Sequence, residues 1–138
     1  MMAEDKVRRG CIYVVGLGPE TGPDSSLESG PERTGWSRKR PVLVVQNDLG
    51  NLSADTTIVV ALSSRVPSKL YPFHVMLPAE ILGSPGIVMC EQIWTVGLQR
   101  IDPQALAECS RELMDQVDSA LRLSLGLGAE TGGRQPVG

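Results

Sequence analysis

Arg40 and Ser63 are the residues of this 138-residue chain whose types and positions best suit chemistry on a phosphate. Arg40 stands just before the apolar run at 42–45, where a rigid strand would hold its guanidinium in place. A guanidinium is planar, always charged and able to grip a phosphate through two parallel hydrogen bonds. Ser63 ends another apolar run, where its hydroxyl could donate to a phosphate oxygen. Taken alone, each residue is more simply interpreted as a strand-end arginine and a turn serine.

The other side chains argue against several familiar mechanisms. His74 is the only histidine, so one chain cannot supply a histidine pair as acid and base, and its alternating surroundings favour a structural role. No H-E-x-x-H or D-x-D cluster occurs, which argues against a hydrolytic metal site. There is no G-x-x-x-x-G-K-[ST] loop, and the glycines at 16 and 18 lack the third glycine of a dinucleotide site. We therefore expect neither a metal nor a cofactor.

The cysteines and the charges also limit the function. Cys11, Cys90 and Cys109 are widely spaced and odd in number, which predicts small apolar residues in a reducing compartment rather than disulfides or zinc ligands. A net charge of −3 and a pI near 5.1 argue against a general nucleic-acid coat. The charge is uneven, however, because residues 33–40 carry a basic cluster and residues 102–118 are mostly acidic. Such asymmetry can attract phosphate at one place and repel it at another.

Apolar periodicity predicts short strands closed by one helix. We expect strands at 10–15, 41–46, 57–63 and 73–77, one or two more within 86–96, and a turn at 47–51. The run at 42–45 suggests a strand buried on both faces. From Ser110, a plausible N-cap, the pattern becomes helical and stops at Gly126 or Gly128. The apolar face of that helix comprises Leu113, Met114, Val117, Ala120, Leu121 and Leu125.

The chain length predicts a single domain over residues 1–128. Within it, residues 19–39 form a long loop rich in Gly, Pro, Ser and charge, and loops of this length are functional lids or disordered. The Gly-rich tail at 129–138 is expected to be disordered. No apolar run approaches the roughly 20 residues that span a bilayer, and the charged N-terminus fits no signal peptide. We expect a cytoplasmic protein without a membrane segment.

Several segments read together closely resemble the MazF/PemK toxin family. They are R-G-C-I-Y at 9–13, L-G-P at 17–19, R-P-V-L-V-V-Q-N-D at 40–48 with Asn51, Y-P-F-H-V at 71–75 and E-Q-I-W-T at 91–95. The helix at 113–123 completes the series, and the resemblance extends in order from residue 9 to residue 127. The R-P-V-L-V-V-Q-N-D motif and the E-Q-I-x-T motif are each fairly specific to this family.

This resemblance implies a fold, an activity and partners. The fold is α+β, a small SH3-like or CcdB-like β-barrel with a C-terminal helix. The activity is sequence-specific cleavage of single-stranded RNA without a metal, in which the ribose 2′-hydroxyl attacks the adjacent phosphate. The products carry 2′,3′-cyclic phosphate and 5′-hydroxyl ends. The implied partners are a second copy of the chain, which forms the RNA groove at the dimer interface, and a MazE/PemI-like antitoxin.

The resemblance also assigns the site residues. Arg40 would chiefly stabilise the charge of the phosphorane-like transition state. A role as general acid or base is the alternative, although a guanidinium keeps its proton near neutral pH. Ser63 stands where the family usually has threonine, so the hydroxyl is kept and a methyl group is lost. RNA-binding positions would be Glu20, Trp36, Arg38, Lys39, Gln46, Asn47, Gln92 and Trp94. For the acidic loop position, Asp24, Glu28 and Glu32 are alternatives to Glu20.

Some positions depart from the family pattern and leave alternatives open. Trp94 replaces the usual arginine of E-Q-I-R-T, and Gly97 and Leu98 replace a charged pair. Trp94 could stack on a base, or pack in the barrel or the dimer interface. Trp36 could be a stacking platform, a loop anchor or an antitoxin contact. Two other functions compete with cleavage: a CcdB-like toxin that binds gyrase, and a degenerate relative that only binds an antitoxin.

Overall fold

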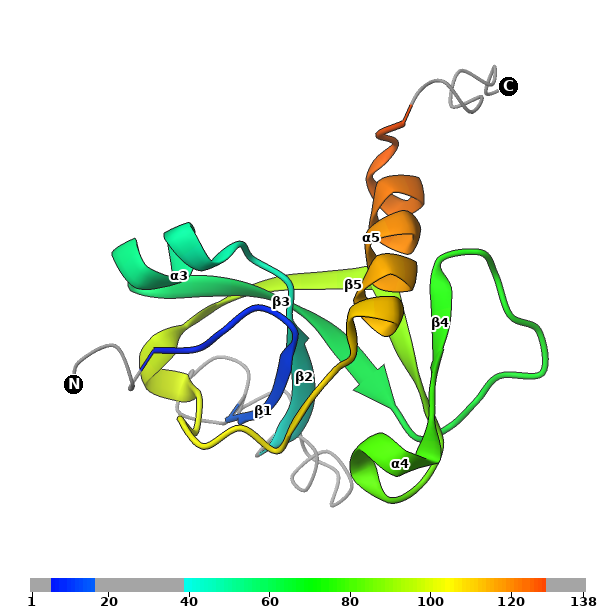
Figure 1. Ribbon diagram of the computed structural model, residues 1–138, viewed down its shortest axis with the longest axis horizontal. Coiled ribbons are helices and arrows are strands. Elements are labelled where there is room, and N and C mark those ends of the chain that lie inside the picture. The colour runs from blue at the N-terminus through cyan, green and yellow to red at the C-terminus, as the bar shows by residue number, and fades with distance from the viewer. Residues whose placement is uncertain (1–5, 17–38, 129–138) are drawn as a thin grey trace, which may run out of the picture.

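Six antiparallel strands form one sheet that curls into a half-barrel (Figure 1). The computed structural model describes residues 6–16 and 39–128. The strands are β1 (Cys11–Val15), β2 (Arg40–Val44), β3 (Thr56–Ser63), β4 (His74–Leu77), β5 (Gly86–Gly97) and β6 (Ala107–Glu108). Their order across the sheet is β4-β5-β3-β2-β1-β6. With a helix at the C-terminal side, this is the predicted α+β barrel, and one continuous β5 occupies the segment for which one or two strands were expected.

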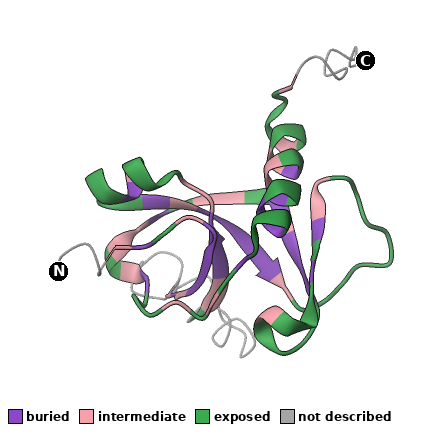
Figure 2. Cartoon of the chain, in the orientation of Figure 1, coloured by how far each residue is buried: buried purple, intermediate pink, exposed green. Residues whose placement is uncertain are grey.

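The sheet buries side chains on both of its faces (Figure 2). We call one group the helix-side core: Ile12, Leu43, Val60, Leu62, Val75, Leu77, Val88, Cys90, Cys109, Leu113, Met114, Val117 and Ala120. The other, the loop-side core, comprises Val7, Cys11, Tyr13, Val15, Val42, Val44, Val59, Val96 and Ile101. Because successive side chains of a strand point to opposite faces, neighbours in β2 enter different cores. The prediction that this strand is buried on both faces is confirmed for residues 42–44.

Helix α5 (Arg111–Leu125) covers the helix-side face and packs on β4 and β5 (Figure 1). The Ser110 hydroxyl caps its start by accepting from the backbone N–H of Leu113 at 3.1 Å. Gly126 ends it with φ of 74°, a left-handed conformation that glycine adopts without a Cβ clash. Both predicted caps are confirmed. The predicted apolar face was wrong at Leu125, which is exposed because the last turn extends beyond the sheet.

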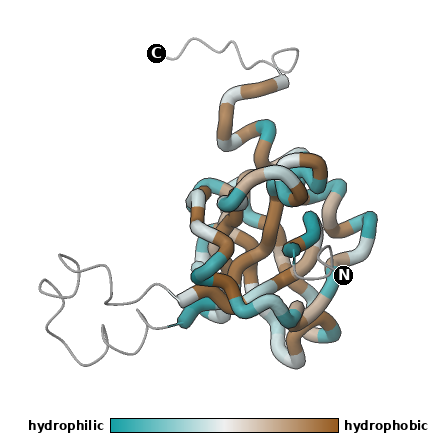
Figure 3. Tube along the Cα trace, turned by 90° about the vertical axis from the view of Figure 1, so that its left-hand side faces the viewer, coloured by the Kyte–Doolittle hydropathy of each residue, from teal (hydrophilic) through white to brown (hydrophobic). Residues whose placement is uncertain are grey.

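Two short helices were not predicted. The segment expected to be a turn at 47–51 is instead the start of α3 (Asp48–Ser53). Asn47 caps this helix, its side-chain oxygen accepting from the backbone N–H of Gly50 at 2.7 Å, so residues typical of turns begin a helix here. Helix α4 (Ala79–Leu82) follows β4, and the 3-10 turn η3 (Leu98–Arg100) follows β5. Apolar segments run through the middle of the barrel (Figure 3).

A β-bulge divides β5 into two halves of opposite facing. Ala61 pairs with Met89, but the preceding residue, Val60, pairs with Ile93. Three residues of β5, at 90–92, are therefore inserted between consecutive partners. Because three is odd, the insertion reverses the alternation of side chains along the strand. Val88 consequently enters the helix-side core, whereas Val96, eight residues further on, enters the loop-side core.

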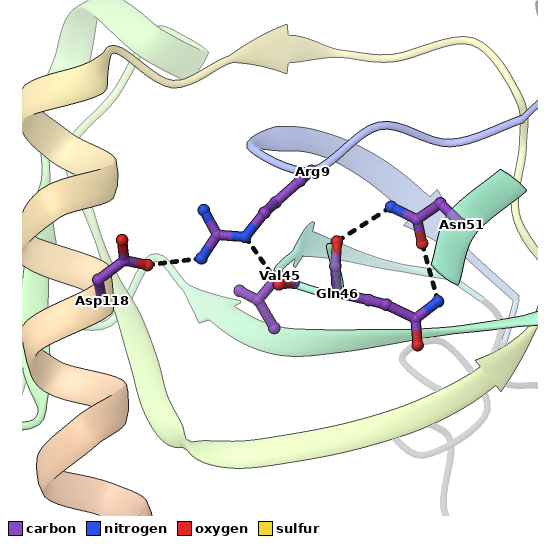
Figure 4. Close-up of polar contacts among 5 residues, drawn as sticks. All are labelled: Arg9, Val45, Gln46, Asn51 and Asp118. Atoms are coloured by element: carbon purple, nitrogen blue, oxygen red, sulfur yellow. Dashed lines mark hydrogen bonds and ion pairs between the residues drawn. The ribbon is translucent and has the colours of Figure 1, made fainter. Parts of the chain in front are cut away.

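Two polar clusters fasten the segments around β2 (Figure 4). Arg9 donates from Nε to the backbone oxygen of Val45 at 2.9 Å and pairs with Asp118 of α5. Asn51, which is fully buried, donates to the backbone oxygen of Gln46 at 3.0 Å and accepts from the Thr57 hydroxyl at 2.6 Å. Asn51 also accepts from Nε2 of Gln46 at 3.0 Å. This single amide therefore ties α3 to the ends of β2 and β3.

Replacing Asn51 by alanine should lower the free energy of unfolding by about 2–4 kcal/mol, because buried partners such as the Thr57 hydroxyl would lose their hydrogen bonds. Urea unfolding followed by circular dichroism would measure the loss. Ser53→Ala is the matched control, since its hydroxyl bonds the Leu49 backbone oxygen on the exposed side of the same helix. Equal stability of the two variants would contradict a structural role for the amide.

Candidate active site

Arg40 and Ser63 lie opposite each other on neighbouring strands. The pairs Val42–Ala61, Leu43–Val60 and Val44–Val59 set the register of β2 and β3. Continuing that register by two residues places Arg40 across from Ser63. Directly opposed residues of an antiparallel pair project from the same face of the sheet. Arg40 alternates with Val42 and Val44, so this is the face of the loop-side core.

The two residues line one open pocket. Two further serines, Ser64 and Ser84, also line it. The remaining lining is Pro41, Leu62, Leu77, Leu82, Pro85 and Gly86. A guanidinium and several hydroxyls beside apolar walls can hold an anionic group next to a flat or apolar one. The pocket thus brings together the two residues that the sequence singled out for phosphate chemistry.

Local contacts hold the Ser63 hydroxyl at the end of β3. The Ser63 Oγ atom accepts from the backbone N–H of Arg65 at 3.0 Å and lies 3.4 Å from the backbone oxygen of Arg65. The serine is half-buried, and its hydroxyl hydrogen can turn between that oxygen and a ligand in the pocket. As a donor, such a hydroxyl can stabilise a developing negative charge.

Gly86, at the start of β5, lies close to the backbone of Ser63. An ideal Cβ atom built on Gly86 would stand 2.9 Å from the backbone oxygen of Ser63. That distance is shorter than a carbon and a carbonyl oxygen tolerate, so only glycine fits without moving the backbone of Ser63. From the sequence, Gly86 was only the first residue of an expected strand segment at 86–96, and Ser64 and Ser84 carried no signal of their own.

The guanidinium of Arg40 lies over the indole ring of Trp94. The Cζ atom of Arg40 lies 5.9 Å from the centre of the indole ring, within the range of cation–π contact. Trp94 is half-buried and packs against the loop-side core. The sequence left open whether Trp94 stacks on a base or packs in the barrel or the dimer interface. Within a single chain, Trp94 packs in the barrel.

The other predicted RNA-binding residues are spread over the fold. Lys39 is exposed next to Arg40, and Gln92 is exposed on the β5 bulge. Gln46 and Asn47 lie beyond the far end of β2 from Arg40, where one belongs to the Asn51 cluster and the other caps α3. Glu20, Trp36 and Arg38 fall outside the described residues, as do the tail at 129–138 and most of the loop at 19–39.

His74 and the cysteines do not line the pocket. The His74 Nδ1 atom accepts from the backbone N–H of Tyr71 at 3.1 Å, and Nε2 lies 3.4 Å from a carboxylate oxygen of Glu91. All three cysteines are buried, and none of them forms a disulfide. Burial raises the pKa of Cys11, that of Cys90 to about 12 and that of Cys109 to about 11, so none is a ready thiolate nucleophile. Among residues 6–16 and 39–128, no group of His, Cys, Asp and Glu could hold a metal ion.

Comparison with known proteins gives consistent similarities. Residues 8–125 match the family described as PemK-like, MazF-like toxin of type II toxin-antitoxin system. The Endoribonuclease EndoA of Bacillus subtilis (strain 168) is 34% identical over 123 residues, which cover 88% of this chain and 96% of that protein. An endoribonuclease from a mycobacterial species, solved in complex with its cognate antitoxin, shares the fold with a TM-score of 0.67 and 23% identity, over 88% of this chain and 97% of its own. MazF of Deinococcus radiodurans gives a TM-score of 0.64 and 26% identity, over 88% and 98%.

Gly86→Ala should lower the free energy of unfolding by about 1–3 kcal/mol, because the added methyl group must displace the Ser63 backbone. Urea denaturation would measure this change. Ser84→Ala is the control, since it removes one exposed oxygen from the same turn and adds no volume. Unfolding of Gly86→Ala at the wild-type urea concentration would refute the close contact.

Proposed function

The chain belongs to the PemK-like, MazF-like family of type II toxins, and on that premise we propose that it is an endoribonuclease that cuts single-stranded RNA at a short sequence. The observation that carries the proposal is the cross-strand placement of Arg40 and Ser63 in one pocket. A cation and a hydroxyl donor held on rigid strands can position a phosphate group and stabilise the negative charge that develops on it during cleavage. The gyrase-binding alternative is not favoured, because the relatives at this level of similarity are endoribonucleases.

The proposed reaction uses the RNA as its own nucleophile. The ribose 2′-oxygen forms a bond to phosphorus while the bond from phosphorus to the 5′-oxygen breaks. The 2′-hydroxyl loses its proton and the departing 5′-oxygen gains one, leaving a 2′,3′-cyclic phosphate and a 5′-hydroxyl. Arg40 would bind the non-bridging oxygens as their negative charge grows, and Ser63 would donate to one of them. The reaction is proposed to need no metal.

RNA binding would extend from this pocket over the surface around it. Lys39 and Gln92 are exposed and could contact the strand directly. Gln46 and Asn47 would bind through groups that their structural hydrogen bonds leave available, and Glu20, Trp36, Arg38 and Trp94 complete the proposed set. We propose that the toxin domain spans residues 1–128 with the long loop bordering the RNA.

The proposed partners are those of the family. We infer a homodimer with the RNA groove at its interface, and a MazE/PemI-like antitoxin whose acidic segment would compete for the basic cluster near Arg40. No helix within the described part of the chain has the length and apolarity to cross a membrane. We propose that the protein acts in the cytoplasm, where its RNA substrate would be.

Arg40→Ala should abolish cleavage of a long single-stranded RNA in the presence of EDTA, because the charge of the transition state would lose its cation. The wild-type protein should give discrete products with 5′-hydroxyl ends, which end mapping would identify together with the cut sequence. Arg111→Ala, which removes an exposed arginine of α5, should cut like the wild type. A folded wild-type protein that leaves several RNAs intact would refute the proposed function.

Ser63→Ala should reduce kcat by about 10²-fold, the usual effect of losing one donor to a developing oxyanion. Ser63→Thr restores the hydroxyl and fixes its rotamer, so its rate should equal or exceed that of the wild type. Single-turnover cleavage of an oligonucleotide with the mapped sequence would measure both. Equal rates for the alanine and threonine variants would remove Ser63 from the mechanism.

A further inference from the structure

We propose that Trp94 is a positioning residue for Arg40: its indole face fixes the plane of the guanidinium so that the N–H edges point at the bound phosphate. The inference rests on the proposed ribonuclease function for its kinetic consequences, but its structural part can be tested without RNA.

The β5 bulge places Trp94 on the same face as Arg40. If residues 90–92 continued the regular pairing of the strand, Trp94 would share the facing of Val88 and Cys90, which belong to the helix-side core. Because they form a bulge instead, Trp94 pairs with Val59 and faces the loop-side core, as Val96 does. Arg40 lies on that face two positions before Val42. The indole therefore extends across the curled surface of β3 toward the start of β2.

The surroundings of Trp94 make it a rigid support. The residue is half-buried against the valine-rich loop-side core, so its rotamer is restricted before any ligand arrives. Arg40 is the first residue of β2 and lines the open pocket. A fixed aromatic ring beside a guanidinium reduces the conformational freedom that the side chain has left to lose when it binds phosphate.

Stacking and phosphate binding use different parts of the guanidinium. In the proposed arrangement the indole ring supports the face of the cation, and the guanidinium carbon lies over the ring at 5.9 Å from its centre. Phosphate is bound through the N–H edges in the plane of the cation. The two contacts therefore do not compete, and a plane held by Trp94 restricts the directions in which the donors can point.

A kinetic experiment separates this role from base stacking. Trp94→Leu should lower kcat about 10- to 100-fold with KM changed little, as expected when a catalytic group is misplaced. Trp94→Phe, which keeps an aromatic face, should recover most of the rate. In an Arg40→Lys background, Trp94→Leu should have a much smaller further effect, because lysine has no planar face. A raised KM with unchanged kcat, or an equal effect in both backgrounds, would overturn the proposal in favour of a base contact or general packing.

A spectroscopic measurement needs no RNA and so distinguishes failure of this inference from failure of the proposed function. The chain has two tryptophans, and Trp36→Phe leaves Trp94 as the sole indole reporter. In that background, Arg40→Ala should shift the Trp94 emission to longer wavelength, because water replaces the guanidinium over the ring. Lys39→Ala, which removes the neighbouring exposed cation, should leave the emission unchanged. If the emission wavelength of Trp94 were unchanged by Arg40→Ala, the proposed contact would be overturned even if the protein cuts RNA.

Discussion

The register change between β3 and β5 is the constraint on which the two-sided architecture depends. One strand supplies Val88 to the core beneath α5 and Val96 to the opposite core, and only an odd insertion allows both. β5 therefore takes part in building the helix-covered face and the face that carries Arg40. The bulge at 90–92 overlaps the start of the E-Q-I-W-T motif at 91–95, so residues of that motif also take part in changing the facing of the strand.

The candidate site is assembled by strand pairing rather than by loops. Arg40 and Ser63 are 23 positions apart on the chain, but the β2–β3 register brings them to one row of the sheet. Backbone hydrogen bonds of the sheet fix that row, and Gly86 lets β5 approach it closely. The polar clusters of Arg9 and Asn51 brace the opposite end of β2, where Gln46 and Asn47 have structural partners. The contacts of Arg9 and Asn51 thus restrain β2 at one end, and Arg40 occupies the other end of the same strand.

Much of this fold follows from the sequence, since the strands at 11–15, 40–44, 56–63 and 74–77 and the caps Ser110 and Gly126 are legible as local patterns. The bulge cannot be recognised in the sequence, because residues 90–92 have the composition of an ordinary strand. They are left out of the pairing only because Met89 and Ile93 on either side of them pair with the consecutive residues Ala61 and Val60. Asn47 misled for a related reason: the same side chain suits a turn and a helix cap. Arg40 and Ser63 were found as residue types, whereas their opposition, Gly86 and the Arg40–Trp94 contact are long-range consequences of register.

The position of α5 in the chain has a consequence for biosynthesis. Val60, Leu62 and Val75 belong to a core that is completed by Cys109 and by Leu113, Met114, Val117 and Ala120. A chain emerging from the ribosome exposes the sheet first, and its apolar face stays uncovered until the helix follows. The loop-side core, whose members all precede the helix, can pack earlier, but the row containing Arg40 and Ser63 then lacks the completed helix-side core on the other face of the sheet. The complete fold around the candidate site therefore forms only after the codons for this helix have been translated.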